Sequence, residues 1–184
     1  MTGVQKLCLA EIRERLKQLK GLEKREFFIC DSVPSGVPRG VICEVTGSAR
    51  TQWILHLLKQ NPSLNTFWVE GQLTILPTSI HQRGVELSRI LIAEAGDKLF
   101  QTLRKALRSK LFDCVVLPGA IDEVKMLKAL QLFARESNAS IFFLSKIAKH
   151  AWAIPFQIDV NWIEIENQYT VEVLKSKFFR SDSV

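Results

Sequence analysis

The residues with the clearest potential for chemistry follow a short apolar stretch, residues 41–45, which comes after a turn cluster rich in proline and glycine. The stretch ends in Thr46 and opens into a helical pattern with tryptophan, isoleucine and leucine on one face. A strand, a tight loop and a helix in this order can bind phosphate, because backbone N–H groups surround the phosphate, a lysine follows and a hydroxyl holds Mg²⁺. The loop residues at this place are Gly47, Ser48, Ala49, Arg50 and Thr51.

This loop is shorter than a phosphate-binding loop. The GxxxxGK[ST] pattern places its lysine six residues after the first glycine, whereas Arg50 lies three residues after Gly47. Ala49 stands where the last glycine should be, and Arg50 and Thr51 stand where the lysine and the hydroxyl residue should be. Such a loop cannot encircle a triphosphate. The sequence therefore predicts a nucleotide-binding scaffold that has lost its nucleotide.

The acids that an ATPase needs are also missing. Phosphoryl transfer requires an acid at the end of a central strand to hold Mg²⁺, and usually a carboxylate that orients the attacking water. Pro118 occupies the first position, and Asp113 lies at the other end of that strand, where we expect it to cap or solvate a turn. Glu70 is a candidate for the second position, since it ends the strand expected at 66–69. We expect no enzyme activity and no cofactor, with a weak residual ATPase as an alternative.

Metal and disulfide chemistry are not expected either. The three histidines (His56, His81 and His150) are far apart and lack cysteine or acidic ligands at metal-binding spacing. The four cysteines form no CxxC pair, and two of them fall in expected buried strands, where cysteine packs as a small hydrophobe. We predict packed or surface histidines, reduced thiols and no metal.

Length and composition indicate one soluble globular domain. The chain has 184 residues, 47% hydrophobic and 24% charged, with no apolar run long enough for a membrane span or a signal peptide. A cytoplasmic location is the default expectation. The net charge of +6 is a mild bias toward nucleic acid or another acidic surface.

Short apolar strands alternate with helices along the chain. This alternation predicts a mainly parallel central sheet with helices on both faces. Two longer segments at the end, 157–166 and 169–175, predict an antiparallel hairpin at the sheet edge. The strands are expected at 41–45, 66–69, 87–92, 113–117 and 140–144, and the helices after 50, at 77–84, from 96 to 109 and at 122–137 with Asp122 as N-cap.

The helix expected at 96–109 carries a basic face. Arg104, Lys105 and Arg108 lie away from its apolar stripe. Most such faces are only solvated, but this one could also contact DNA phosphates without sequence preference.

The N-terminal segment reads as an amphipathic helix over residues 4–20. Its apolar stripe consists of Val4, Cys8, Ile12, Leu16 and Leu19. A connector over 22–40, charged and then rich in proline and glycine, follows this segment. The helix could cover its own domain or dock on a partner or a second copy of the chain. We therefore divide the chain into a docking helix (1–21), a core domain (22–175) and a flexible tail (176–184).

The order of these features resembles the core of the RecA recombinase superfamily, and among its divergent bacterial members ImuA, an accessory of damage-induced mutagenic DNA synthesis, and SulA, a cell-division inhibitor. The resemblance spans residues 5–175. The segments that carry it are GVPRGVICEVTG (36–47), SART (48–51), FWVEG (67–71), RGVELSRIL (83–91), AGDKLFQTLRKALRS (95–109) and DCVVLPG (113–119).

The resemblance implies roles for single residues. Arg50 and Thr51 are similar to the phosphate-loop lysine and hydroxyl residue, and Glu70 matches the acid that ends the second strand. Gln72 falls where the recombinase has its water-activating glutamate, and Pro118 replaces the aspartate of the metal site. Nothing corresponds to the recombinase's mobile DNA-binding loops, so we do not expect recombinase activity.

These observations favour an interaction protein. The expected function is a non-catalytic, ImuA-like accessory of the bacterial DNA-damage (SOS) response that binds a translesion polymerase, a recombinase or DNA. The alternative is a SulA-like inhibitor that binds the tubulin-like division protein. Both functions need only an interaction surface, so the sequence does not separate them.

Overall fold

The computed structural model describes residues 26–119, 121, 123–147, 153–163 and 168–178. The apolar stripe of the N-terminal segment (Val4, Cys8, Ile12, Leu16 and Leu19) lies outside the described residues, as do His150, Asp122 and the end of the tail. The strands are β1 (Phe27–Phe28), β2 (Val37–Pro38), β3 (Ile42–Thr46), β4 (Thr66–Glu70), β5 (Ile90–Glu94), β6 (Cys114–Pro118), β7 (Ser140–Leu144), β8 (Phe156–Ile163) and β9 (Gln168–Ser176). The α-helices are α2 (Arg50–Gln60), α3 (Pro77–Gln82), α4 (Leu99–Ser109) and α5 (Val124–Ser137).

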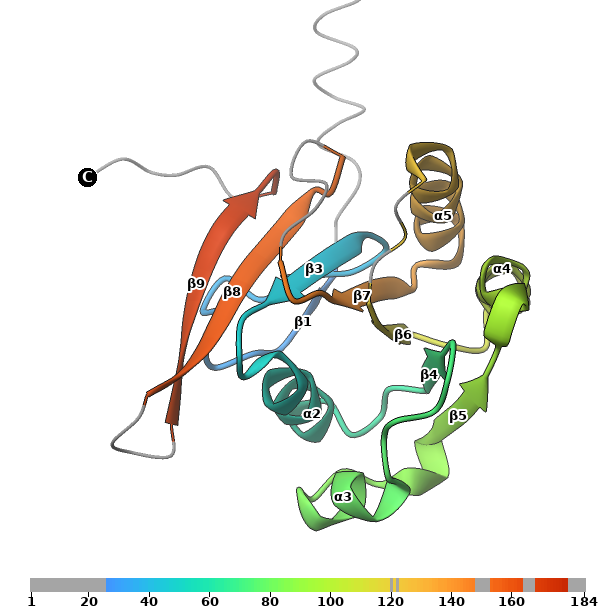
Figure 1. Ribbon diagram of the computed structural model, residues 1–184. Helices are drawn as coiled ribbons and strands as arrows, with labels where there is room; N and C mark the ends of the chain where they lie inside the picture. The colour runs from blue at the N-terminus through green and yellow to red at the C-terminus, as the bar shows by residue number, and fades with distance from the viewer. Residues whose placement is uncertain (1–25, 120, 122, 148–152, 164–167, 179–184) are drawn as a thin grey trace, which may run out of the picture.

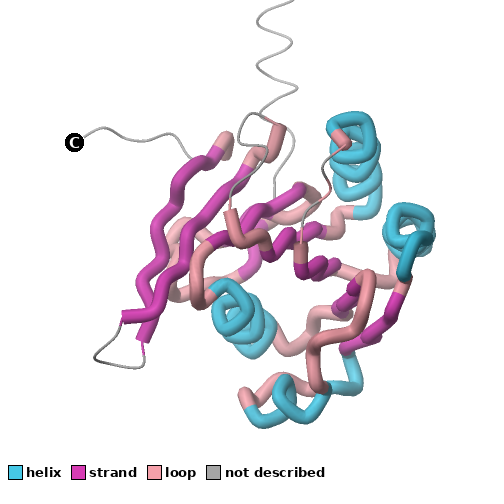
Figure 2. The backbone as a smooth tube through the Cα atoms, in the orientation of Figure 1, coloured by secondary structure: helices cyan, strands magenta, loops and turns pink. Residues whose placement is uncertain are grey.

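The centre of the molecule is a seven-stranded sheet with the order β5-β4-β6-β7-β3-β8-β9 (Figure 1). All its neighbouring strands are parallel except β8 and β9, which form an antiparallel hairpin at one edge. Figure 2 shows helices connecting most of the parallel strands. The predicted α/β class, the mainly parallel sheet and the C-terminal hairpin are confirmed.

Consecutive residues of the central strands enter two separate core clusters. On β7, Phe142 and Leu144 belong to a cluster that includes Trp53 and Ile54 of α2 and Ile80 of α3. The alternate residues, Ile141 and Phe143, belong to a second cluster with buried residues of α4 and α5. Because both sides of these strands are buried, their sequences read as continuous apolar runs, which is typical of parallel sheets. All five residues of β7 are buried, as the run SIFFL predicted.

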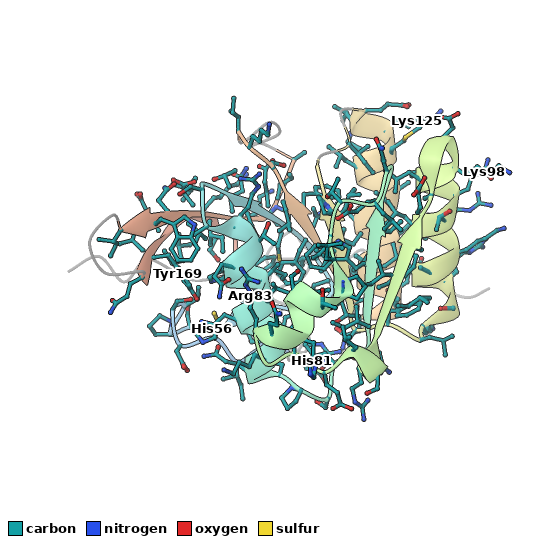
Figure 3. The ribbon with its side chains drawn as sticks, turned by 60° about the horizontal axis from the view of Figure 1, so that its bottom comes forward. His56, His81, Arg83, Lys98, Lys125 and Tyr169 are labelled. Carbon is teal, nitrogen blue, oxygen red and sulfur yellow. The ribbon has the colours of Figure 1, made fainter. Side chains whose placement is uncertain are left out.

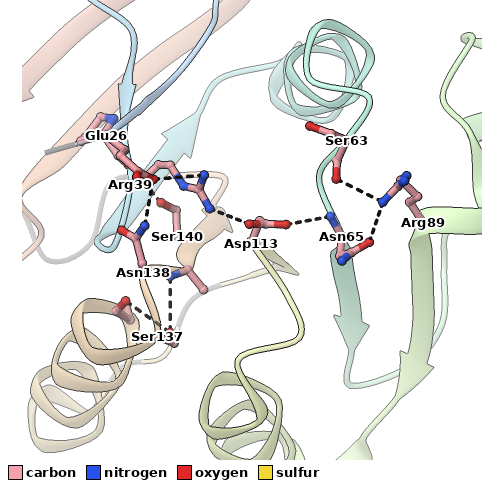
Figure 4. A network of polar contacts seen from close by, with 12 residues as sticks. Glu26, Arg39, Ser63, Asn65, Arg89, Asp113, Ser137, Asn138 and Ser140 are labelled. Atoms are coloured by element: carbon pink, nitrogen blue, oxygen red, sulfur yellow. Dashed lines mark hydrogen bonds and ion pairs between the residues drawn. The ribbon is translucent and has the colours of Figure 1, made fainter.

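The described part of the segment before β3, residues 26–40, packs as part of the domain, which corrects the prediction of a connector for these residues. In its described part, β1 and β2 pair antiparallel, and Phe28, Val33 and Val37 are buried in the first core cluster. Arg39 then reaches across to Asp113 with 2.6 Å between its guanidinium nitrogen and the carboxylate oxygen (Figure 4).

Asp113 does more than cap or solvate a turn. Its second carboxylate oxygen accepts a hydrogen bond of 3.0 Å from the backbone N–H of Asn65, just before β4. Arg39 also pairs with Glu26 at 3.3 Å. The network therefore joins the segment before β3 to the beginnings of β4 and β6 (Figure 4).

The third strand begins later than predicted. Residues 87–92 were expected to form it, but Leu87–Arg89 make a 3-10 helix and β5 begins at Ile90, which lies opposite Thr66 of β4. Ser88 hydrogen-bonds Glu86 through its hydroxyl, a local bond that competes with extended pairing.

The helices begin and end close to where the sequence predicted. Helix α4 buries Leu103, Ala106 and Leu107, and α5 is preceded by Glu123 as its N-cap residue, which makes no side-chain cap bond. Lys110 and Asn138 follow α4 and α5 in the left-handed conformation that ends helices. Within the described part of the chain, none of the helices is both long and apolar enough to cross a membrane.

Candidate functional site

A cleft of about 700 Å³ opens at the carboxyl ends of the parallel strands. Glu70, Pro118 and Leu144, the last residues of β4, β6 and β7, line one side of it. Arg50 and Thr51, the first residues of α2, line another side. Ligands of open α/β sheets bind at this edge, so the cleft is the candidate site.

The loop before α2 is closed against β8. The backbone N–H of Ser48 donates to the side-chain oxygen of Asn161 at 3.1 Å, and that of Ala49 donates to the carbonyl of Val160 at 2.9 Å. Arg50 donates from its guanidinium to the carbonyl of Gly47 at 2.7 Å. Donors that a phosphate-binding loop would aim at phosphate are therefore bonded within the protein.

Gly47 itself lies against the backbone of β8. Its φ is +90°, and a Cβ built on it would lie 2.1 Å from the carbonyl oxygen of Val160. Only glycine fits both the left-handed backbone and this contact. The glycine thus allows the loop and β8 to pack together.

Glu70 is a buried carboxylate, 3% exposed, with both oxygens bonded. One accepts from the indole N–H of Trp68 at 2.8 Å, and the other accepts from the hydroxyl and the backbone N–H of Thr74. The carboxylate therefore fixes the segment that follows β4 over one side of the cleft. These bonds give Glu70 a structural role.

The charged side chains of the cleft are mainly basic. Arg50, Arg83 and Lys146 line it, whereas Glu70 is the single acid among the described lining residues. Arg83 is held by two bonds, from its Nε to the side chain of Gln52 and from its Nη1 to the carbonyl of Ser79. This arrangement can hold an anionic group.

Ser145 adds an unusual feature to the cleft. It follows β7 directly, is 3% exposed, and its hydroxyl finds no hydrogen-bond partner among the described residues. Its backbone N–H, by contrast, donates to the carbonyl of Val45 at 3.0 Å. Buried hydroxyls normally have a partner, so this one marks the wall of the cleft as polar.

The structure brings four of the sequence-predicted site residues together in the cleft: Arg50, Thr51, Glu70 and Pro118. Gly47, Ser48 and Ala49 face β8 instead of the cleft, and Gln72 is exposed and outside the described lining.

The lining residues that sequence reasoning missed include Arg83, Ser145 and Lys146. Ser145 and Lys146 follow the predicted strand 140–144 directly, so the rule that sites lie at carboxyl ends of strands could have found them. Arg83 follows α3, and no local signal in the sequence indicates that it faces the cleft.

The predicted basic face lies away from the cleft. Arg104, Lys105 and Arg108 are exposed on α4, and the guanidinium of Arg108 lies 5.9 Å from the ring centre of Phe133 on α5. Figure 3 shows Lys98 and Lys125, which flank this side at α4 and α5, far from Arg83 and His56.

Histidine and cysteine side chains in the described part are packed or on the surface. His56 hydrogen-bonds the Tyr169 hydroxyl through Nδ1, and His81 is exposed on α3. Burial raises the pKa of the Cys43 and Cys114 thiols well above the usual value, because the thiolate would be desolvated. No group of three or more His, Cys, Asp or Glu residues in the described ranges is arranged to hold a metal ion.

Comparison with known proteins adds no relative. A scan against protein-family models finds no match to the chain, and a search of curated proteins likewise finds none.

Proposed function

We propose that the chain is a non-catalytic, RecA-like accessory protein of the ImuA type, which serves the bacterial DNA-damage response in the cytoplasm. It acts by binding a protein partner, a translesion polymerase or a recombinase, or DNA. The observation that carries the proposal is the closed loop before α2, in which Ser48 and Ala49 donate their N–H groups to β8.

The resemblance implies a nucleoside triphosphate with Mg²⁺, and this ligand does not fit the residues present. The N–H groups of Ser48 and Ala49 and one guanidinium nitrogen of Arg50 already have partners. Pro118 offers no side-chain oxygen at the end of β6. Glu70 uses both carboxylate oxygens in bonds to Trp68 and Thr74. These three features favour a binding role over phosphoryl transfer.

The architecture supports the RecA-like assignment at a coarse level. Two core clusters on opposite sides of the central strands, one containing α2 and α3 residues and the other α4 and α5 residues, favour a sheet with helices on both faces. The hairpin β8–β9 extends that sheet at one edge.

An exposed apolar group supports a protein partner. Leu73, Leu76 and Leu91 are each more than 40% exposed, and the first two belong to the segment that leads from β4 to α3. Leu91 lies on β5, the outermost strand at its end of the sheet, and the N–H of Leu73 contacts Glu94 of the same strand. Edge strands with exposed apolar side chains are common binding surfaces for other chains.

The competing function is a SulA-like inhibitor that binds the tubulin-like division protein. It uses the same kind of interaction surface and equally needs no nucleotide. The two functions differ in what the cell does after DNA damage, and a genetic experiment can therefore separate them.

The test is deletion and controlled expression of the gene in its native host. An ImuA-like accessory predicts that deletion lowers the damage-induced mutation frequency and that expression without damage leaves cell length unchanged. Filamentous cells on expression without damage, together with an unchanged mutation frequency in the deletion strain, would support the division inhibitor. A Leu73→Asp/Leu91→Asp variant tests whether the apolar group at β5 is the binding surface.

A further inference from the structure

A second concavity, of about 370 Å³, lies at the ends of the strands opposite to the cleft, where β3 and β8 begin. Gly40 and Val41, which precede β3, and Pro155, which precedes β8, line it. Lys177 and Phe178 follow β9. They lie beside the beginning of β8 because β9 runs antiparallel to β8. Helix α5 forms the other wall, and Figure 1 shows α5 beside the beginning of β3. We name this concavity the basic groove.

Both walls of the basic groove carry positive charge. Lys128 and Arg135 line it from α5, and Lys177 lines it from the segment after β9. None of the described residues that line it is acidic. The acids outside it include Glu26, which pairs with Arg39 and accepts a hydrogen bond from Asn138, and the exposed Glu136.

The floor of the groove is partly apolar. Leu132 on α5 is 54% exposed and lies between Lys128 and Arg135 along the helix. Val41, Pro155 and the partly buried Phe178 complete the apolar lining. Positive walls with an apolar floor suit a ligand with charges along its backbone and flat groups beside it.

Lys177 also lies close enough to Lys175, a lysine of β9 outside the groove lining, to affect its charge. Desolvation lowers the pKa of Lys175, and the positive charge of Lys177 lowers it further. An anion bound near Lys177 relieves this repulsion.

We infer that the basic groove binds the phosphate backbone of single-stranded nucleic acid, with Lys128, Arg135 and Lys177 as the phosphate contacts. This assignment rests on the proposed function in its DNA-binding form, to which it gives a site, and that site differs in place from the basic face of α4. Lys128 and Arg135 are separated by a rise of about 10 Å along α5, so they can contact different phosphates of one strand.

The shape of the groove favours a single strand over a duplex. A concavity with cations on two facing walls can enclose one backbone, whereas a duplex needs a broad surface that contacts both strands. Unpaired bases can also pack on the exposed Leu132 and the partly buried Phe178. Stacking of bases on aromatic side chains accompanies a positive groove in other proteins that bind single strands. An acidic peptide would gain from the charges but has no flat groups for that floor.

The test measures binding of a short labelled oligothymidylate by fluorescence anisotropy at several salt concentrations. Three phosphate contacts predict a salt slope of about −2, which is roughly a 20-fold loss of affinity between about 50 and about 200 mM salt. The triple variant Lys128→Gln/Arg135→Gln/Lys177→Gln should weaken binding about tenfold or more at low salt. The control Lys59→Gln/Arg89→Gln/Lys98→Gln removes the same charge elsewhere and should bind like the parent.

Several results would overturn the inference. They are no binding by the parent at low salt, equal binding by the parent and the groove variant, tighter binding of a duplex of the same length, or displacement of the oligonucleotide by polyglutamate at equal charge concentration. Loss of binding only in Arg104→Gln/Lys105→Gln/Arg108→Gln would place the contact on α4 instead. If the groove triple fails to fold, the single changes Lys128→Gln and Lys177→Gln should each reduce the slope by about 0.7.

Discussion

Addition of Mg-ATP should leave the stability of the folded chain unchanged, because three donors at the loop before α2 are already bonded within the protein. The N–H groups of Ser48 and Ala49 donate to β8 at 3.1 and 2.9 Å, and Arg50 donates to Gly47 at 2.7 Å. A triphosphate bound by these three donors would have to break all three bonds. Each such bond contributes about 0.5 to 1.5 kcal/mol net, and an N–H left unpaired costs more.

The size of the effect to be excluded follows from linkage. A ligand that binds only the folded state with a dissociation constant of about 10 μM adds about 2.7 kcal/mol at 1 mM. For a chain of this length, about 1 kcal/mol raises the melting temperature by about 2 to 4 °C. Binding of that strength would therefore raise it by about 5 to 11 °C. Differential scanning fluorimetry with Mg-ATP against Mg²⁺ alone resolves such a shift, and we expect a change within about 1 °C.

Two variants locate any binding that does occur. ATP is itself a polyanion, so a shift that vanishes in Lys128→Gln/Arg135→Gln/Lys177→Gln belongs to the basic groove and leaves the reasoning intact. A shift that persists in that variant and vanishes in Arg50→Ala would show that the loop opens for nucleotide. That result would refute the argument from the closed loop and would restore the weak ATPase as the leading function.

Two further predictions concern the rest of the fold. Tyr169 is the single tyrosine of the chain, and burial, followed by the charges of Cys30 and Asp31, raises its pKa to about 12 from an ordinary value of 10.0. The stability that the neutral Tyr169 hydroxyl contributes is complete below about pH 10 and is lost as the pH rises through about 12. A tyrosinate absorbance titration of the folded protein measures this pKa. Half-ionisation of Tyr169 near pH 10 would contradict the prediction. Asp113→Asn should cost about 1 to 3 kcal/mol in urea unfolding, because it leaves the Arg39 guanidinium, with its side chain 20% exposed, without its closest partner. Glu26→Gln changes an exposed pair and should cost at most about 1 kcal/mol. Equal costs for the two changes would show that the pair of Arg39 with Asp113 stabilises the fold no more than the exposed pair with Glu26.

The core strands could be predicted because the composition of each short segment indicates that it is buried. Runs such as SIFFL at 140–144 are apolar at every position, and a strand buried on both sides requires that composition. The strand at 87–92 was displaced because Ser88 and Glu86 form a local bond that keeps Leu87–Arg89 in a turn. Apolar content alone does not distinguish that turn from a strand.

The segment at 26–40 was misjudged for a different reason. Its proline and glycine content is typical of a linker, yet Phe28 and Val37 pack into the core cluster beside α2. Its anchor, the pair between Arg39 and Asp113, joins residues 74 positions apart in the sequence. Contacts over such separations follow from the sheet topology, which composition does not reveal.

The site was partly predictable, because ligands of a parallel sheet bind at the carboxyl ends of its strands, and the ends of the strands can be located from the sequence. Glu70 and Pro118 were found in this way, and Ser145 and Lys146 lie at the equivalent end of β7. The side chain of Arg83 enters the cleft from the residue after α3. Its direction depends on the bonds to Gln52 and Ser79, and neither bond leaves a pattern in the sequence.

Gly47 shows why a phosphate-loop motif and a closed loop look alike in a sequence. Both need a residue without a side chain, because in both cases a polar group approaches the backbone closely: phosphate oxygens in the first, the carbonyl of Val160 in the second. What separates them is the length of the loop. With Arg50 three residues after Gly47, the loop is too short to surround a phosphate group, and its N–H groups turn toward β8, where Val160 and Asn161 accept them. The short loop and the hairpin that begins with β8 therefore act together, and the hairpin takes the place that phosphate would have as the hydrogen-bond acceptor of the loop.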